Sequence, residues 1–331
     1  MSAVLPSPTA PPGDPLLAEP VVAGEWFIVM NRGSGAEEKD EARQAIETEL
    51  AQAGRSYRFV PVGERGIVAA CQEAGRLAAE HGGILVAAGG DGTINCAAQA
   101  ALSCGCPLGL IPQGTFNLFA RQLGMPLDPA AATRALLRGA PEPQQVGLVN
   151  QRVFLVNASV GLYPKLLADR EVAKKKLGRR RVVAMLAALK SMLEWRLQLV
   201  LDAEIDGDPM QLRTASVFLC NNRLQLQRLG IAPAVVEQVG AGRLACLLVP
   251  RMGVWAKLRM LAGAAFGKLG EDRELRSLPL RSLGCASRFA RRLKVATDGE
   301  VQWMQLPLRF TVAPRALQVM VPPPDERLPP Q

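Results

Sequence analysis

Histidine and tyrosine are scarce in this chain, which has one histidine, His81, and two tyrosines among 331 residues. A single histidine excludes metal centres built from several histidines, and it leaves carboxylates as the groups for acid–base chemistry. The seven cysteines are an odd number and lack the paired spacing of a zinc site or a disulfide framework. We therefore expect reduced, buried thiols and assign no role to Cys104 and Cys106.

Long apolar runs and the common nucleotide motifs are also missing. No run approaches the roughly 20 residues of a membrane-spanning helix, and neither G-x-G-x-x-G nor G-x-x-x-x-G-K-[ST] occurs. The second absence disfavours standard dinucleotide and P-loop folds. Residues 1–23 hold six prolines and no lysine or arginine, so the basic leader of a secretory signal is missing. We expect a disordered tail over 1–23 and a cytoplasmic protein.

Charge and length bear on the partners and the domain count. The chain carries 39 Lys plus Arg against 30 Asp plus Glu, a net charge of +9 that suits a polyanionic partner. Anionic lipid fits better than nucleic acid, because the basic residues are not interleaved with aromatic ones. At about 150 residues per domain, the length predicts two domains with a cleft between them.

The hydrophobic pattern changes near residue 146. Before it, strands alternate with helices, which predicts a parallel sheet covered by helices, with strands at 26–30, 57–62, 84–88 and 108–111 and helices at 36–53, 64–80 and 93–102. After it, the chain is predominantly β, with a hairpin signal at Asp298-Gly299. There we expect strands at 153–158, 197–205, 216–220, 244–249, 293–297, 301–306 and 308–312, and helices at 179–195 and 253–266.

Residues 89–93, with the sequence Gly-Gly-Asp-Gly-Thr, lie between an expected strand and an expected helix that Thr93 could cap. Glycines let backbone N–H groups approach a ligand, and a helix N-terminus favours phosphate. Asp91 would repel phosphate unless a cation lies between them, which predicts a divalent metal such as magnesium. A plain strand-to-helix turn is the alternative. Two further loops, 31–35 and 111–117, follow strands of the same sheet and would face the same site.

Two of these loops carry a family resemblance. The Gly-Gly-Asp-Gly-Thr loop followed by Pro112-x-Gly114-Thr115-x-Asn117 resembles the catalytic domain of diacylglycerol, sphingosine and ceramide kinases, in particular the bacterial lipid kinases. The similarity extends to 31–35, to Asn221-Asn222 and to Asp298-Gly299-Glu300. The Gly-Gly-Asp-Gly-Thr loop alone is shared with NAD kinases and resembles the corresponding loop of phosphofructokinase.

The resemblance implies a two-domain α/β enzyme. Its expected parts are an α/β nucleotide-binding domain over 24–145 of the phosphofructokinase and NAD kinase type, a predominantly β-sandwich substrate domain over 146–297, and a segment over 298–322 that returns to the first domain. It also implies an ATP- and magnesium-dependent kinase that transfers the γ-phosphate to the hydroxyl group of a lipid such as diacylglycerol, in phospholipid biosynthesis.

Carried over by position, the resemblance assigns the site residues. Asp91 would hold the metal, and Asp298 and Glu300 would stand at the acceptor hydroxyl, with Asp298 as general base. The nucleotide site would comprise Asn31, Ser34, Gly35, Gly89, Gly90, Gly92, Thr93, Gly114, Thr115 and Asn117.

The chain departs from the family pattern at two positions. Arg32 stands where the first loop usually has proline, and Leu118 stands where many members have aspartate. If the aspartate helps to hold metal or to orient the acceptor, the chain manages without it. Two alternatives therefore stay open: an NAD kinase-like enzyme, and a non-catalytic nucleotide- or lipid-binding regulatory protein.

Two basic segments suit a membrane surface. The run 174–181 precedes an apolar stripe on the expected helix from Arg179, and Trp255, Leu258, Leu261 and Phe266 form a second stripe. Core packing is the alternative for both. The expected partners are a lipid substrate and, through peripheral association, the anionic inner face of the membrane, with no nucleic acid; a homodimer is left open.

Overall fold

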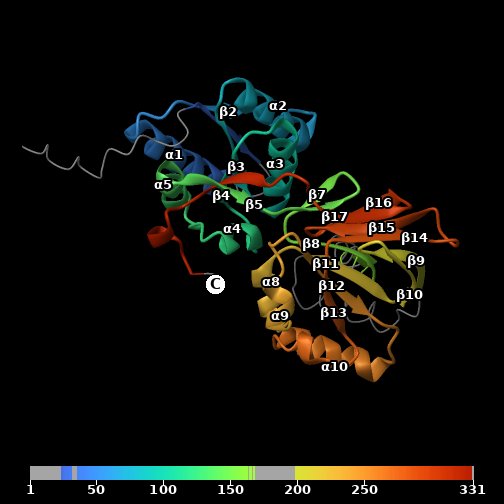
Figure 1. Ribbon diagram of the computed structural model, residues 1–331. Helices are drawn as coiled ribbons and strands as arrows, with labels where there is room; N and C mark the ends of the chain where they lie inside the picture. The colour runs from blue at the N-terminus through green and yellow to red at the C-terminus, as the bar shows by residue number, and fades with distance from the viewer. Residues whose placement is uncertain (1–23, 32–35, 163, 166, 168–197, 330–331) are drawn as a thin grey trace, which may run out of the picture.

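The computed structural model describes residues 24–31, 36–162, 164–165, 167 and 198–329 (Figure 1). The expected helix at 179–195 and the loop residues Arg32, Ser34 and Gly35 lie outside these residues. The described chain forms one mixed sheet with helices on both sides and two further sheets that pack face to face. The predicted fold class, an α/β domain followed by a β-sandwich, is confirmed.

The first sheet is parallel in its N-terminal part, in the order β2-β1-β3-β4. Every residue of β3 is buried, as expected for a strand with helices over both faces. The strands are β1 (Trp26–Met30), β2 (Tyr57–Val60), β3 (Ile84–Gly89) and β4 (Leu108–Pro112). The helices of this part are α1 (Ala36–Gln52), α2 (Gly66–Glu80), α3 (Asp91–Cys104), α4 (Leu118–Gln122) and α5 (Pro129–Arg138).

The C-terminal part of the chain completes the first sheet. Strand β18 (Leu317–Val321) lies between β4 and β5 (Ala140–Gln144), and appears in red among the green strands of Figure 1. Strand β5 was not predicted because it contains Pro141 and Pro143, and a strand with two prolines is tolerated at a sheet edge. A 3₁₀ turn at Pro324–Glu326 follows β18.

The sandwich consists of two six-stranded sheets whose inner faces share one core. One sheet contains β6 (Gly147–Val149), β7 (Arg152–Phe154), β9 (Leu199–Ile205), β10 (Asp208–Thr214), β14 (Ser282–Ala286) and β17 (Leu308–Val312). The other contains β8 (Asn157–Gly161), β11 (Ser216–Cys220), β12 (Leu244–Val249), β13 (Arg276–Leu280), β15 (Arg292–Thr297) and β16 (Glu300–Gln305). Outside them lie α8 (Arg223–Arg228), α9 (Pro233–Val236), α10 (Val254–Ala265) and the 3₁₀ turn Leu269–Glu271.

Three expectations need correction. The strand predicted at 153–158 is two strands, β7 and β8, because the backbone N–H groups of 155–157 turn to the side chain of Asp298 instead of a neighbouring strand. The returning segment predicted at 298–322 begins after β17, because β16 and β17 pair inside the sandwich. Helix α3 starts at Asp91 with Gly90 as its N-cap, so Thr93 lies inside the first turn.

The cysteines are free thiols. All seven are free, as expected, and burial raises the pKa of the Cys71 thiol to about 12 and that of Cys106 to about 11.

The two ends of the apolar stripe along α10 are in contact with solvent. Trp255 and Phe266 are 85% and 81% exposed, so these ends of the stripe are not part of a core.

Candidate functional site

Two glycine loops meet at the carboxyl ends of β3 and β4. A Cβ atom on Gly114 would lie 2.8 Å from the Cα atom of Gly90, and the N–H of Gln113 donates to the carbonyl oxygen of Gly89 at 2.9 Å. The two backbones are therefore in direct contact, and side chains larger than hydrogen would separate them. The sequence prediction that these loops face one site agrees with this contact.

Asn117 holds the second loop in shape. It has φ 49°, a left-handed conformation that asparagine tolerates, and it is 2% exposed. Its side chain accepts from the N–H of Gly114 at 2.9 Å and donates to the carbonyl oxygen of the same residue at 2.8 Å. Its backbone N–H donates to Oδ2 of Asp91 at 3.1 Å. Asn117 therefore acts on the loop backbone and on Asp91.

Asp91 lies half-buried at the first turn of α3. Burial raises the pKa of its carboxyl group, while N–H donors that include those of Asn117 and Leu118 oppose the shift. Thr93 is 5% exposed, and its hydroxyl would lie 2.7 Å from a Cβ atom on Gly89, so it packs beneath the loop. The exposed residues of this region include Asn31, after β1, Thr115 and Phe116.

Asp298 occupies the β15–β16 turn, where φ is 47° for Asp298 and 90° for Gly299. Its carboxylate accepts four hydrogen bonds: from the N–H groups of Leu155, Val156 and Asn157 at 2.8, 2.9 and 2.9 Å, and from Nδ2 of Asn95 at 2.7 Å. Burial raises the pKa of this carboxyl group, and the four donors act in the opposite direction. Each carboxylate oxygen accepts two of the four bonds.

Helix α3 connects the glycine loop with the β15–β16 turn. Besides its bond to Asp298, Nδ2 of Asn95 donates to the carbonyl oxygen of Val153 at 3.1 Å, and Oε1 of Gln99 accepts from the N–H of Val153 at 2.8 Å. The helix that begins with Asp91 therefore also fixes β7 and the turn. The two domains meet at the site through side chains of this helix.

Glu300, next to this turn, faces the glycine loop. A Cβ atom on Gly92 would lie 3.3 Å from Oε1 of Glu300, while Oε2 pairs with Arg152 at 2.8 Å. Arg152 also donates to Thr297 at 3.2 Å and to Gln302 at 2.9 Å, which fixes its guanidinium group. The Glu300 side chain is 58% exposed, so it remains accessible to a ligand over Gly92.

This arrangement fits a polyphosphate and one magnesium ion. Glycine at positions 90 and 114 lets the two loops touch, and a Cβ atom on Gly92 would crowd Glu300. The first turn of α3 has N–H groups without intrahelical acceptors. Among the described residues, no group of three His, Cys, Asp or Glu side chains is placed to hold a metal ion. Asp91 would therefore be the protein ligand of magnesium, and phosphate oxygens and water would supply the other ligands, as is common for this ion.

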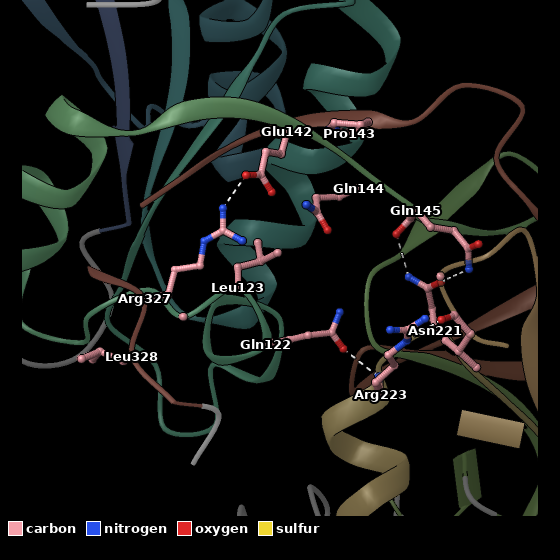
Figure 2. A pocket seen from close by; sticks show the side chains of 13 residues that line it. Gln122, Leu123, Glu142, Pro143, Gln144, Gln145, Asn221, Arg223, Arg327 and Leu328 are labelled. Carbon is pink, nitrogen blue, oxygen red and sulfur yellow. Dashed lines mark hydrogen bonds and ion pairs between the residues drawn. The ribbon is translucent and has the colours of Figure 1, made fainter. Parts of the chain in front are cut away.

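Asn221 and Asn222 join the domains beside the site. Asn221 exchanges hydrogen bonds with Gln145, and Nδ2 of Asn222 donates to the carbonyl oxygen of Leu118 at 3.2 Å. Figure 2 shows a pocket of about 430 Å³ between the domains, with the ion pair of Arg327 and Glu142 on one side and Asn221 on the other. This pocket is lined by the end of α4, by β5, by residues 221–223 and 239–240 and by the C-terminal segment, not by the glycine loops.

Several of these residues were missed by the sequence analysis. Asn95, Gln99 and Arg152 carry no local motif, and their partners lie far along the chain, so only the fold brings them together. Leu118 starts α4 and packs partly buried against the first core, so no carboxylate occupies that position.

Comparison with known proteins identifies the family. The model for the diacylglycerol kinase catalytic domain matches residues 25–149, and the model for the YegS C-terminal NAD kinase β-sandwich-like domain matches residues 160–321. Residues 25–149 belong to the diacylglycerol kinase catalytic-domain family. The resemblance inferred from the two glycine loops is therefore confirmed.

Two of the similar curated proteins have kinase names. A protein of Pseudomonas aeruginosa (strain UCBPP-PA14) named "Probable lipid kinase YegS-like" is 46% identical over 98 residues, which are 28% of this chain and 32% of that protein. The diacylglycerol kinase of Bacillus subtilis is 40% identical over 89 residues, which are 26% and 29% of the two chains. The match thus spans about a third of the length of these curated relatives.

A solved structure shows the same fold over most of the chain. The crystal structure of a diacylglycerol kinase from Bacillus anthracis str. Sterne has a TM-score of 0.63 and 18% sequence identity, and the match covers 91% of this chain and 97% of that one. The arrangement of an α/β domain and a sandwich is therefore shared with a diacylglycerol kinase.

Proposed function

We propose that this member of the diacylglycerol kinase family is an ATP- and magnesium-dependent lipid kinase that phosphorylates the hydroxyl group of a lipid such as diacylglycerol. The observation that carries the proposal is the position of Glu300, a sandwich residue whose Oε1 lies beside Gly92 of the glycine loop. Phosphoryl transfer mainly needs a phosphate held by N–H donors and metal next to a positioned hydroxyl group. In this site the glycine loops and Asp91 would hold the phosphate and the metal, and Glu300 would position the hydroxyl group.

The proposed roles follow from the contacts. Gly90 and Gly114 let the two loops touch, and Gly92 leaves the first turn of α3 open to phosphate. Asn117 holds the second loop, and Asp91 is the metal ligand. Magnesium, when bound, neutralises charge on the transferred phosphate. Asn31 and Thr115 are exposed side chains near the strand ends and are proposed nucleotide contacts. Thr93 packs beneath Gly89 and supports the first glycine loop, residues 89–93.

We favour Glu300 as the group that takes the proton of the acceptor hydroxyl group. The sequence analysis expected Asp298 in this role. Four N–H donors already occupy the two oxygens of Asp298, and accepting a proton would require one of these bonds to break. Oε1 of Glu300 faces the glycine loop and is accessible. Asp298 is then a positioning residue that holds 155–157 and the β15–β16 turn.

A lipid acceptor also implies work at a membrane. None of the helices in the described ranges has both the length and the hydrophobicity to cross a bilayer. We propose peripheral association with the inner face of the membrane and a place in phospholipid metabolism, supported by the excess of basic residues.

The test is transfer of labelled γ-phosphate from ATP with magnesium. Diacylglycerol, sphingoid and monoacylglycerol acceptors are offered in mixed micelles, and NAD is offered in parallel. Phosphorylation of a lipid is the expected result and identifies the acceptor class. Phosphorylation of NAD alone contradicts the proposal in favour of a dinucleotide kinase. Nucleotide binding without any transfer contradicts it in favour of a regulatory protein.

Replacing Asp91 by asparagine should lower the rate of transfer and raise the stability of the fold. We expect transfer to fall about 10²–10³-fold, because the metal side of the site loses its charge. Burial raises the pKa of Asp91 in the folded protein, so ionisation of this group costs stability as the pH rises through that pKa. The variant should therefore unfold at a higher temperature than the wild type at pH 8, and the difference should shrink toward pH 4.

Kinetics and thermal unfolding over this pH range measure both effects. Asp128→Asn is the matched control, since Asp128 caps α5 away from the site and should leave transfer unchanged. Full activity of Asp91→Asn would contradict the metal role.

Replacing Gly114 by alanine should push the two glycine loops apart. Its Cβ atom would meet the Cα atom of Gly90 at 2.8 Å and Oδ1 of Asn117 at 2.6 Å, so a backbone must move. Because a misplacement of about 1 Å can cost 10²-fold, we expect kcat/KM to fall by about that factor. Gly63→Ala is the control, since nothing lies within 4 Å of a Cβ atom there. Equal kinetics of the two variants would contradict the loop contact.

A further inference from the structure

One end of the sandwich carries two exposed aromatic side chains among arginines. Phe289, in the connection between β14 and β15, is 84% exposed, and Trp303 of β16 is 55% exposed. Large aromatic side chains left in water indicate an interaction site when they lie together with a consistent charge. We call this the sandwich-end surface; it comprises Arg288, Phe289, Arg291, Arg292, Lys294 and Trp303.

The charge of the sandwich-end surface is mostly positive. Arg288, Arg291, Arg292 and Lys294 are all exposed, and no acidic residue occurs in the sequence from 286 to 297. Arg288 pairs with Asp202 at 3.2 Å, and its side chain is still 81% exposed. The surface therefore presents several cations within one short segment.

A groove of about 730 Å³ opens in this surface between the β14–β15 connection and the chain between β16 and β17. Arg291 and Arg292 line it together with small and apolar residues, and none of the described residues that line it is acidic. A groove with two guanidinium groups matches the geometry of a phosphate group, which arginine binds through two N–H donors.

Two cationic side chains lie against the ring of Trp303. The guanidinium carbon of Arg292 lies 4.8 Å from the centre of its ring, and Nζ of Lys294 lies 5.5 Å from it. Trp303 thus presents an apolar ring with positive charge beside it, the combination that proteins place at the boundary between lipid headgroups and acyl chains.

We propose that the sandwich-end surface docks on an anionic lipid bilayer, with Phe289 inserted between headgroups and Arg291 and Arg292 bound to lipid phosphates. The choice of a lipid surface rests on the proposed function. Charge complementarity alone would also suit a nucleic acid, but an exposed Phe289 without a ring partner among the described aromatic contacts suits an apolar boundary better.

The β15–β16 hairpin connects this surface with the candidate site. Arg292 starts β15 and Asp298 follows its end, so the two ends lie about 20 Å apart at the usual rise of a strand. The β15–β16 turn contacts α3 through the hydrogen bond from Asn95 to Asp298, so the start of β15 lies at the end of the hairpin away from that helix.

The test is sedimentation with vesicles of phosphatidylglycerol and phosphatidylcholine, without ATP, at several salt concentrations. We expect binding only to the anionic vesicles and weaker binding as salt rises. Phe289→Ala should lower the partition coefficient about tenfold. The double variant Arg291→Glu, Arg292→Glu should lower it by at least about 25-fold, since each cation near an anionic surface contributes about fivefold.

Control variants separate the surface from total charge and from other exposed aromatic residues. The double variant Arg58→Glu, Arg65→Glu removes the same charge from the first domain and should retain binding. Trp255→Ala removes the exposed aromatic residue of α10 and should also retain it. Thermal unfolding checks that every variant is folded.

The outcomes also separate this inference from the proposed function. Equal loss in the two double variants, or loss in Trp255→Ala and none in Phe289→Ala, overturns the docking surface. Binding to a DNA oligonucleotide that matches the vesicles and is insensitive to Phe289→Ala overturns the lipid assignment. Kinase activity toward lipid in detergent micelles tests only the proposed function, because no bilayer is present there.

Discussion

Replacing Asp298 by asparagine should lower the free energy of unfolding by about 3 kcal/mol and reduce phosphoryl transfer below detection. The carboxylate accepts four N–H donors, two on each oxygen. An asparagine side chain has one oxygen and places an NH₂ group against the remaining donors. At least two N–H groups then lose their acceptor, at about 1–3 kcal/mol each. Transfer falls because the β15–β16 turn and residues 155–157 lose their common anchor.

The chain contains a matched control for this variant. Asp206 occupies the β9–β10 turn with φ 51°, before Gly207 with φ 100°, and accepts the N–H groups of Arg281 and Ser282, both at 2.7 Å. Asp206→Asn therefore makes the same change in the same kind of turn, far along the chain from the glycine loops. We expect a smaller loss of stability and unchanged transfer.

Denaturant unfolding and steady-state kinetics of both variants provide the readouts. If Asp298→Asn folded with wild-type stability and lost only kcat, Asp298 would take the proton itself, and its role as a positioning residue would be wrong. If the two variants behaved alike in both measurements, the four-donor contact would have no special role.

The sequence predicted the parallel strands well and the edge strands poorly, for physical reasons. Strands β1, β3 and β4 are apolar throughout because both of their faces are covered, so they are distinct in the sequence. Strand β5 contains two prolines, and most of β10 is exposed, so neither has a hydrophobic pattern that indicates a strand. Strand β18 could be identified as a strand only from its apolar side chains, and its place between β4 and β5 depends on the fold.

The candidate site divides in the same way. Glycine loops and an Asp-Gly turn are local signals, because the backbone conformation they need restricts the residue type. The contact of Asn95 with Asp298 joins residues 203 positions apart, and that of Arg152 with Glu300 joins residues 148 apart. Such pairs leave no periodicity or spacing in a single sequence. The saturation of Asp298 by N–H donors is likewise a property of the fold, and it changes the expected role of that residue.

Replacing Glu300 by glutamine should lower kcat about 10²–10⁴-fold, the usual contribution of a general base, while leaving stability unchanged. Oε1 faces Gly92, and the carboxylate pairs with Arg152 in an ion pair that is partly exposed. Exposed ion pairs contribute about 0–1 kcal/mol, and glutamine can still accept a hydrogen bond from Arg152. The measurement is kcat and KM for ATP and for the lipid, together with thermal unfolding.

The kinetic pattern distinguishes the two carboxylates of the turn. Loss in kcat with an unchanged KM for ATP indicates that Glu300 acts on the acceptor and not on nucleotide binding. Glu204→Gln, an exposed glutamate of β9 in the other sheet, is the control and should have no effect. An unchanged kcat in Glu300→Gln would contradict the proposed role and leave Asp298 and Asp91 as the acidic groups at the acceptor. Because Asp298 cannot accept a proton without releasing an N–H donor, transfer would then require the 155–157 loop to move during each turnover.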